Sequence, residues 1–337
     1  MSPSFSIVIA LQGVALAAGH GPTSARVVRD TWAMGTRLSI VSEAPNHGEG
    51  GAATEIMLRE IERLERMLST WDQSSELSKV NTAPPGSPVA VSPELGGLLA
   101  EAESWAKRTG RAFDPSVGAL VDAWDLRGEG RVPDGAELAL ALTATGPKAF
   151  GFVDSGVIRR SAKGWLDAGA FGKGAALRSA ALAGRGTGSR RLLLNLGGQL
   201  WAEAPPDAPW SIDVAHPARR FEAVARLDVY GVSVATSGGS ERPGHLLDPR
   251  SGLRAPFWGS VTVASADAME ADVLATALYV MGPVDGLEWA RAQPDLAALF
   301  LELTDGPIAA SWTAAMGKWL VEPPQGSVSV PPFSNPH

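Results

Sequence analysis

The sequence predicts an α+β protein, with helices mainly in the first half of the chain and strands mainly in the second. Residues 52–68 place Met57, Ile61, Leu64 and Leu68 on one stripe of a helix whose other face is charged, a pattern typical of a core-facing amphipathic helix. The second half instead carries apolar or alternating runs separated by glycine or Asp-Gly turns. This segregation disfavours a regular alternation of strands and helices around a parallel sheet.

The elements of the first half follow from local patterns. Two short strands are predicted at residues 27–32 and 37–41, because Gly35 supplies a break between them. A second helix is predicted over residues 93–108, ending before a glycine, and a third over the alanine- and leucine-rich residues 136–145. The first half is therefore mainly helical after an opening strand pair.

The strand-rich half contains five runs that fit strands. They are RRLLLNLGGQLWAEA, WSIDVAHP, ARLDVYGVSVATSGG, GSVTVASA and LAALFLELTDGPIAASW. The last run reads as a hairpin around Asp305 and Gly306, because Asp-Gly favours a two-residue turn. One more helix is expected at about residues 270–281, between the last strands.

A glycine-rich segment, LDAGAFGKGAALRSAALAGR at residues 166–185, links the two halves. We expect a strand that ends at Leu166, a turn over residues 169–174 and a helix over about 175–184. Such a turn aims backbone N–H groups and the positive end of a helix dipole at one point, which suits an anion.

This segment is not a Walker A loop. Only two residues separate Gly169 from Gly172, and no serine or threonine follows Lys173. The glycines fit equally well a tight turn between a strand and a helix, with Gly184 as the helix cap. Taken alone, the segment leaves both interpretations open.

Composition limits the classes of function. The 337 residues are 45% hydrophobic and 19% charged, enough for one large or two medium globular domains. The net charge of -7, without a lysine- or arginine-rich run, disfavours nucleic acid or an anionic membrane surface as the main partner. The chain has no cysteine, which excludes disulfides and thiolate chemistry, so any metal would be held by oxygen or imidazole ligands.

The two ends of the chain differ from the middle. Residues 1–24 include an apolar stretch followed by small residues that resemble a signal-peptidase site, although no lysine or arginine precedes it. We expect an export signal there, with a buried or poorly ordered segment as the alternative. Residues 323–337 form a proline-rich tail. Residues 25–322 are then the folded domain.

Three further motifs contain polar residues or glycines, which distinguishes them from segments that only pack in the hydrophobic core. STWDQSSELSKVN places Trp71 where its ring could stack on a planar ligand or simply pack in the core. FDPSVGALVDAW contains Asp114 before a proline, an ordinary turn or helix-start signal. NLGGQL ends a strand in a Gly-Gly pair, which suits close approach to a ligand or a hairpin.

The loop TSGGSERPGHLLDPRSG, residues 236–252, combines Arg242, His245 and Asp248 with glycine turns. Among the five histidines, His245 alone has other polar candidates around it. It could serve as a general base or as a structural hydrogen-bonding residue.

The segment ADAMEADVLATALYVMG places Asp272 and Thr276 four residues apart, so that both oxygens lie on one side of a helix. Such oxygens could hold Mg²⁺, which prefers hard donors and keeps positions for water and phosphate. Alternatively, Asp272 stabilises the helix dipole and Thr276 bonds back to the preceding turn.

Taken together and in their order, these motifs closely resemble the ApbE family of FAD:protein FMN transferases, from about Trp32 to Trp319. The most specific pair is HLLDPRSG with ADVLATAL. The resemblance implies a T-fold-like α+β architecture with mixed or antiparallel sheets, flanking helices, two lobes and an FAD site between the halves.

The resemblance also implies an activity. The family binds FAD, cuts its pyrophosphate and transfers FMN through a phosphoester bond to a threonine or serine hydroxyl of an acceptor flavoprotein, releasing AMP. The acceptor would belong to an electron-transfer system, with the protein exported to the periplasm or cell envelope and the membrane involved only through that acceptor.

Site residues are carried over from the family motifs by position. The side chains of Asp272 and Thr276 with the carbonyl oxygen of Ala170 would hold Mg²⁺, and His245 would take the acceptor proton. The residues implied to contact FAD are Met34, Trp71, Ala112, Phe113, Asp114, Asp167, Lys173, Asn195, Gly197, Gly198, Ser237, Gly238 and Leu247.

Two alternative functions fit the same residues. A metal-dependent FAD pyrophosphatase would use water in place of the acceptor hydroxyl and release free FMN. A non-catalytic exported FAD-binding protein would bind FAD without producing AMP.

Overall fold

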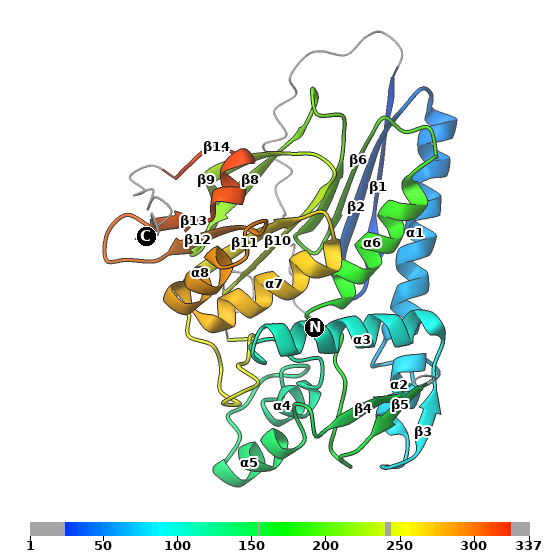
Figure 1. Ribbon diagram of the computed structural model, residues 1–337. Coiled ribbons are helices and arrows are strands. Elements are labelled where there is room, and N and C mark those ends of the chain that lie inside the picture. Colours follow the sequence, from blue (N-terminus) through cyan, green and yellow to red (C-terminus); the bar gives the residue numbers. More distant parts are fainter. Residues whose placement is uncertain (1–23, 154–155, 240–243, 325–337) are drawn as a thin grey trace, which may run out of the picture.

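The computed structural model describes residues 24–153, 156–239 and 244–324 (Figure 1). The expected export signal and the proline-rich tail therefore lie outside the described residues, except for their innermost positions. Arg242, one of the polar candidates, also lies outside them. Within the described residues, no helix is both long and apolar enough to span a membrane.

An antiparallel sheet of eight strands, counted within the described residues, runs through the molecule (Figure 1). The strand pair around Gly35 is confirmed, and so is the hairpin at Asp305 and Gly306, although residues 303–308 connect its strands in place of a two-residue turn. In spatial order the strands are β1 (Ala25–Ala33), β2 (Thr36–Ala44), β6 (Arg191–Leu196), β7 (Gln199–Glu203), β10 (Val232–Gly238), β11 (Gly259–Ser265), β12 (Ala297–Glu302) and β13 (Ala309–Trp312).

Three helices, α1 (His47–Leu68), α6 (Gly172–Gly184) and α7 (Ala268–Met281), cover one face of this sheet, and α8 (Pro283–Arg291) packs beside α7 (Figure 1). The predicted apolar stripe of α1 is confirmed, because its four residues are all buried. The helix starts earlier than predicted because Asn46 caps it by accepting from the Glu49 amide.

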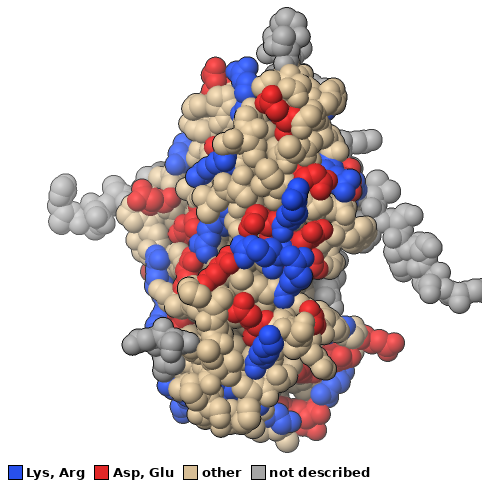
Figure 2. All heavy atoms as spheres, turned by 90° about the vertical axis from the view of Figure 1, so that its right-hand side faces the viewer, with Lys and Arg blue, Asp and Glu red and all other residues tan. Residues whose placement is uncertain are grey.

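The outer face of α1 carries both signs of charge, which Figure 2 shows intermixed on that side of the molecule. Arg63 illustrates the mixture, since it pairs with Glu60 on α1 and with Glu94 on a neighbouring helix. The apolar side chains of α1 therefore face the sheet and its charged side chains face outward, as the sequence predicts.

A second, three-stranded sheet lies against the opposite face of the large sheet. Its strands, in spatial order, are β14 (Leu320–Glu322), β9 (Arg219–Val229) and β8 (Trp210–His216). Trp210 and Leu227 of this sheet share one buried cluster with Leu193, Val234 and Leu299 of the large sheet. Alternate residues of the large sheet thus supply two different cores, one on each face.

Residues 76–159 form what we call the small lobe, seen in the lower part of Figure 1. The helices predicted over 93–108 and 136–145 are confirmed there, whereas its shorter elements were not predicted. Its elements are α2 (Glu76–Thr82), β3 (Pro88–Ala90), α3 (Pro93–Arg108), α4 (Gly118–Ala123), α5 (Gly135–Thr143), β4 (Phe150–Val153) and β5 (Gly156–Arg159).

The glycine-rich segment differs from its prediction in three details. No strand ends at Leu166, where only an isolated bridge joins Trp165 to Val117. Helix α6 begins at Gly172, so Lys173 lies in its first turn. Gly184 is not a cap but the last residue of the helix, and a Cβ there would lie 2.8 Å from the Met57 sulfur. Close packing against α1, not the chain reversal, accounts for this glycine.

Candidate functional site

A cavity of about 700 Å³ lies between the small lobe and the large sheet. Its walls come from the small-lobe segment around residues 112–127, the first turns of α6 and α7, the ends of strands β6, β8 and β10, and the loop that precedes β11. All predicted site residues except Met34 and Trp71 line it. These are Ala112, Phe113, Asp114, Asp167, Ala170, Lys173, Asn195, Gly197, Gly198, Ser237, Gly238, His245, Leu247, Asp272 and Thr276.

Met34 and Trp71 lie outside the lining of this cavity. Met34 occupies the β1–β2 turn with a φ of 51°, and its side chain packs against Gly172 at the start of α6. The Trp71 side chain, just after α1, is 76% exposed and is therefore not a core residue. Met34 thus lies at the start of α6 and Trp71 just after the end of α1, and their contact with FAD stays a prediction.

The first turn of α6 is joined to α7 by a buried carboxylate. Asp272, only 6% exposed, accepts a hydrogen bond from the Gly174 amide at 2.9 Å. Its other oxygen lies 3.6 Å from the Lys173 ammonium. A Cβ at Gly174 would lie 2.3 Å from the Ala268 carbonyl oxygen, so glycine is required for this approach. Helix α6 has no side-chain N-cap, and Asp272 satisfies one of its free amides instead.

Further groups with oxygen atoms that could bind a cation line this cavity. Thr276 lies one helical turn after Asp272, and its hydroxyl is 3.5 Å from that of Ser237. Ala170, in the turn before α6, also lines the cavity. A carboxylate, a hydroxyl and a backbone carbonyl are the hard donors that Mg²⁺ accepts beside water and phosphate oxygens. The residues thus fit that ion, although the described residues contain no group of three or more His, Cys, Asp or Glu suited to a metal.

Asp114 lines the cavity, but its hydrogen bonds are made to residues of its own turn. It is 3% exposed and accepts from the Ser116 amide and hydroxyl and from Arg111. Burial opposes the charge of Arg111, but Glu103 and Asp114 together raise the pKa of this guanidinium. Asp114 therefore stabilises the turn that follows Ala112 and Phe113, which form the adjacent wall.

The Gly-Gly pair predicted after Asn195 makes the β6–β7 hairpin turn. Gly197 and Gly198 have φ values of 57° and 89°, and the Asn195 side chain accepts from the Gly198 amide at 3.0 Å. Next to this turn, the Gln199 side chain donates to the Ala268 carbonyl at 2.8 Å. The turn is thereby joined to the start of α7.

His245 lies at the start of a hairpin-like loop. The loop is closed by bonds from the Ala255 amide to the Leu246 carbonyl and from the Asp248 amide to the Leu253 carbonyl, both 2.8 Å. Trp124 of the small lobe fixes it by donating to the Gly252 carbonyl at 2.8 Å. The Asp248 carboxylate, a polar candidate beside His245 in the sequence, pairs with Arg250 instead.

Arg127 is a cavity residue that the sequence did not reveal. It follows α4 in the small lobe and pairs with Asp167 and Asp122. The Gly169 amide donates to the other oxygen of Asp167 at 2.7 Å. Arg127 and Asp167 lie 40 residues apart along the chain, so no local sequence pattern predicts this ion pair.

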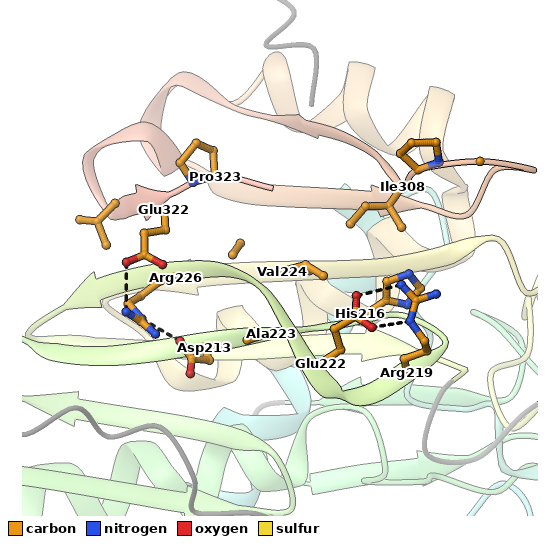
Figure 3. Close-up of a pocket in the computed structure, with 14 residues that line it drawn as sticks. Asp213, His216, Arg219, Glu222, Ala223, Val224, Arg226, Ile308, Glu322 and Pro323 are labelled. Atoms are coloured by element: carbon orange, nitrogen blue, oxygen red, sulfur yellow. Dashed lines mark hydrogen bonds and ion pairs between the residues drawn. The ribbon is translucent and has the colours of Figure 1, made fainter. Parts of the chain in front are cut away.

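A second cavity, of about 740 Å³, lies between the β8–β9 hairpin and the segments at residues 306–308 and 321–323 (Figure 3). We call it the outer groove. None of the predicted site residues lines it. Its charged side chains pair with one another, as Asp213 and Glu322 do with Arg226, and Glu222 with Arg219. Asp213 belongs to the walls of both cavities.

Fold and cavity together define an α+β protein in which a helix-covered antiparallel sheet and a small lobe enclose a cavity lined by carboxylate, hydroxyl and lysine groups. The chain belongs to the ApbE family, whose model matches residues 34–300. The family predicted from the order of the motifs is thereby confirmed.

Known proteins support both family and fold. The chain is 27% identical to a FAD:protein FMN transferase of Klebsiella pneumoniae (strain 342), over 86% of this chain and 88% of that protein. Among solved structures, the flavin transferase ApbE from Vibrio cholerae superposes with a TM-score of 0.78 at 25% identity, covering 88% of this chain and 100% of that one. The ApbE protein of Thermotoga maritima gives 0.76 at 29%, covering 82% and 94%. The predicted α+β fold is confirmed.

Proposed function

We propose that this protein transfers FMN from FAD to a threonine or serine hydroxyl of an acceptor flavoprotein, with release of AMP. The observation that carries the proposal is the convergence of motifs from distant segments on one cavity, with Lys173, Asp272 and Thr276 on one wall and His245 on the loop that borders it. The relatives of this chain named FAD:protein FMN transferase support the same activity.

The reaction exchanges one phosphoester bond for another. The acceptor oxygen forms a bond to the phosphorus of the FMN half, the bond from that phosphorus to the bridging oxygen breaks, and AMP leaves with the electron pair. His245 takes the proton of the attacking hydroxyl. Lys173 and the start of α6 present positive charge to the diphosphate. Mg²⁺, held by Asp272, Thr276 and the Ala170 carbonyl, would neutralise charge on the phosphates.

The partner follows from the same proposal. An acceptor flavoprotein of an electron-transfer system would present its hydroxyl at the mouth of the cavity, and this protein would meet it after export to the periplasm or cell envelope. Mass measurement of the N-terminus of the protein isolated from its host tests the export step, because cleavage near residue 24 would remove the apolar stretch.

Activity is tested with purified protein, FAD, Mg²⁺ and an acceptor domain that carries a threonine in a flavinylation motif. We expect the acceptor to gain one FMN mass as one AMP appears, and chelation of the metal to stop both. AMP with free FMN and an unlabelled acceptor would indicate a pyrophosphatase instead. Bound FAD without AMP under any metal would indicate a flavin-binding protein.

A further inference from the structure

Arg127 links the two sides of the main cavity. One arm of its guanidinium donates to Asp167, in the segment that leads into α6, and the other donates to Asp122 at the surface of the small lobe. The side chains of Arg127 and Asp167 are 23% and 16% exposed, whereas that of Asp122 is 58% exposed. Asp167 is therefore the more enclosed of the two carboxylates that Arg127 binds. Asp122 is more exposed, although burial still raises the pKa of its carboxyl group.

The loop that carries Arg127 is well fixed. The amides of Gly128 and Gly130 both donate to the Asp125 carbonyl, and the Arg131 amide donates to the Trp124 carbonyl at 2.9 Å. Trp124 in turn holds the loop that begins at His245. Arg127 thus projects from a rigid support toward Asp167.

Asp167 is held from two sides. The Gly169 amide binds one carboxylate oxygen and Arg127 binds the other. A carboxylate oxygen can accept more than one hydrogen bond, so both oxygens keep capacity for a donor in the cavity. The group formed by Arg127, Asp167 and Asp122 carries one more negative than positive charge. It therefore suits an N–H or O–H donor better than the diphosphate, which Lys173 is placed to attract.

We propose that Arg127 is a positioning residue for FAD, which orients Asp167 as an acceptor for an N–H or O–H group of the bound dinucleotide. The inference rests on the proposed function, because it takes FAD as the ligand of this cavity. Arg127 acts through Asp167 and makes no bond to the reacting phosphorus.

A double-mutant cycle on FAD affinity tests this role. Fluorescence titration of the full chain with FAD is made for the wild type, Arg127→Gln, Asp167→Asn and the double variant. We expect each single change to weaken binding about tenfold, the range of a charge-assisted hydrogen bond, and the double variant to bind no more weakly than Asp167→Asn. In steady-state assays the KM for FAD should rise in Arg127→Gln while kcat changes less than about threefold.

Control variants distinguish a role of Arg127 in positioning Asp167 from a general loss of structure. Arg131→Gln removes an exposed ion pair with Glu137 from the same loop and should leave FAD affinity unchanged. Asp122→Asn removes the charge of the outer partner of Arg127 alone, and it should weaken FAD binding less than about twofold. Arg127→Lys should restore part of the affinity, because an ammonium can still bind Asp167.

Three results would overturn the inference: unchanged affinity in Arg127→Gln, additive losses in the double variant, or an equal loss in Arg131→Gln. Absence of FAD binding by the wild type would instead refute the proposed function itself.

Discussion

The main cavity and the outer groove are similar in volume but differ in the origin of their polar groups. The groove takes its charges chiefly from one hairpin and from β14, and Arg226 and Arg219 neutralise the neighbouring carboxylates directly. The main cavity collects Asp167, His245 and Asp272 from segments far apart in the chain. Convergence of polar groups from distant segments, more than volume, therefore distinguishes the proposed site from the outer groove.

Substitution of Asp272 on the wall of the main cavity should have the largest effect, and normal activity in its absence would contradict the contrast between the two cavities. We expect Asp272→Ala to lower AMP release by about 10²–10³-fold, because it removes the carboxylate proposed to hold the cation. Asp272→Asn keeps an acceptor for the Gly174 amide, so it should fold normally and still be impaired.

Glu222→Gln is the matched change in the outer groove and should leave AMP release as in the wild type. If Glu222→Gln and Asp272→Asn lowered the rate equally, the distinction between the two cavities would be wrong.

The second test concerns His245. Its replacement by alanine should lower the rate of acceptor labelling by about 10²-fold, the lower end of the usual contribution of a general base. FAD affinity, measured by fluorescence titration, should remain within about twofold because the proton moves only during transfer. A variant that labels the acceptor normally would show that another group takes the proton.

Gly174 offers a test of how the main cavity is built. Gly174→Ala would force a Cβ against the Ala268 carbonyl, and we expect a loss of about 1–3 kcal/mol in the free energy of unfolding. Gly97→Ala is the control, since no atom lies within 4 Å of a Cβ there. It lies in α3 and should stabilise the protein by about 0.5–1 kcal/mol. Urea denaturation measures both, and an undamaged Gly174→Ala would mean that the α6–α7 contact is not tight.

The sequence predicted those parts of the site whose geometry is local. Asp272 and Thr276 share a helix face at a spacing of four, which any helix enforces, and the turn after Asn195 needs only its two glycines. Arg127 could not be predicted, because an ion pair across 40 residues leaves no local pattern. Gly184 was misread because a glycine at a helix end has the same sequence signature whether it caps the helix or packs closely.

The fold shows the same limit. Helices of three or more turns, such as α1, α3 and α7, were predicted, and in α1 the apolar period repeats several times. The short elements α2, α4 and β3 were missed, since six or seven residues of helix or three of strand hold too little of any period. Contacts with the rest of the chain, not local preference, decide such segments.

The smallest expected effect concerns His216 in the outer groove, where we expect a change in stability without a change in catalysis. Burial, together with the charge of Arg219, lowers the pKa of this imidazole below its usual 6.5, against an opposing effect of Glu222. The unfolded chain therefore takes up the proton more readily than the folded one. The stability that the neutral His216 imidazole contributes is fully present above its unfolded pKa. It is lost as the pH falls through that value toward the lower pKa of the folded state.

His216→Asn removes the titrating group but keeps an acceptor for the Ala218 amide, which His216 binds at 3.0 Å. Between about pH 7.5 and about pH 5.5, the melting temperature of the wild type should fall further than that of the variant. Acceptor labelling at neutral pH should be the same for both. Parallel melting curves would contradict the buried neutral imidazole, whereas a lost labelling activity would make the groove part of the site and remove the contrast between the two cavities.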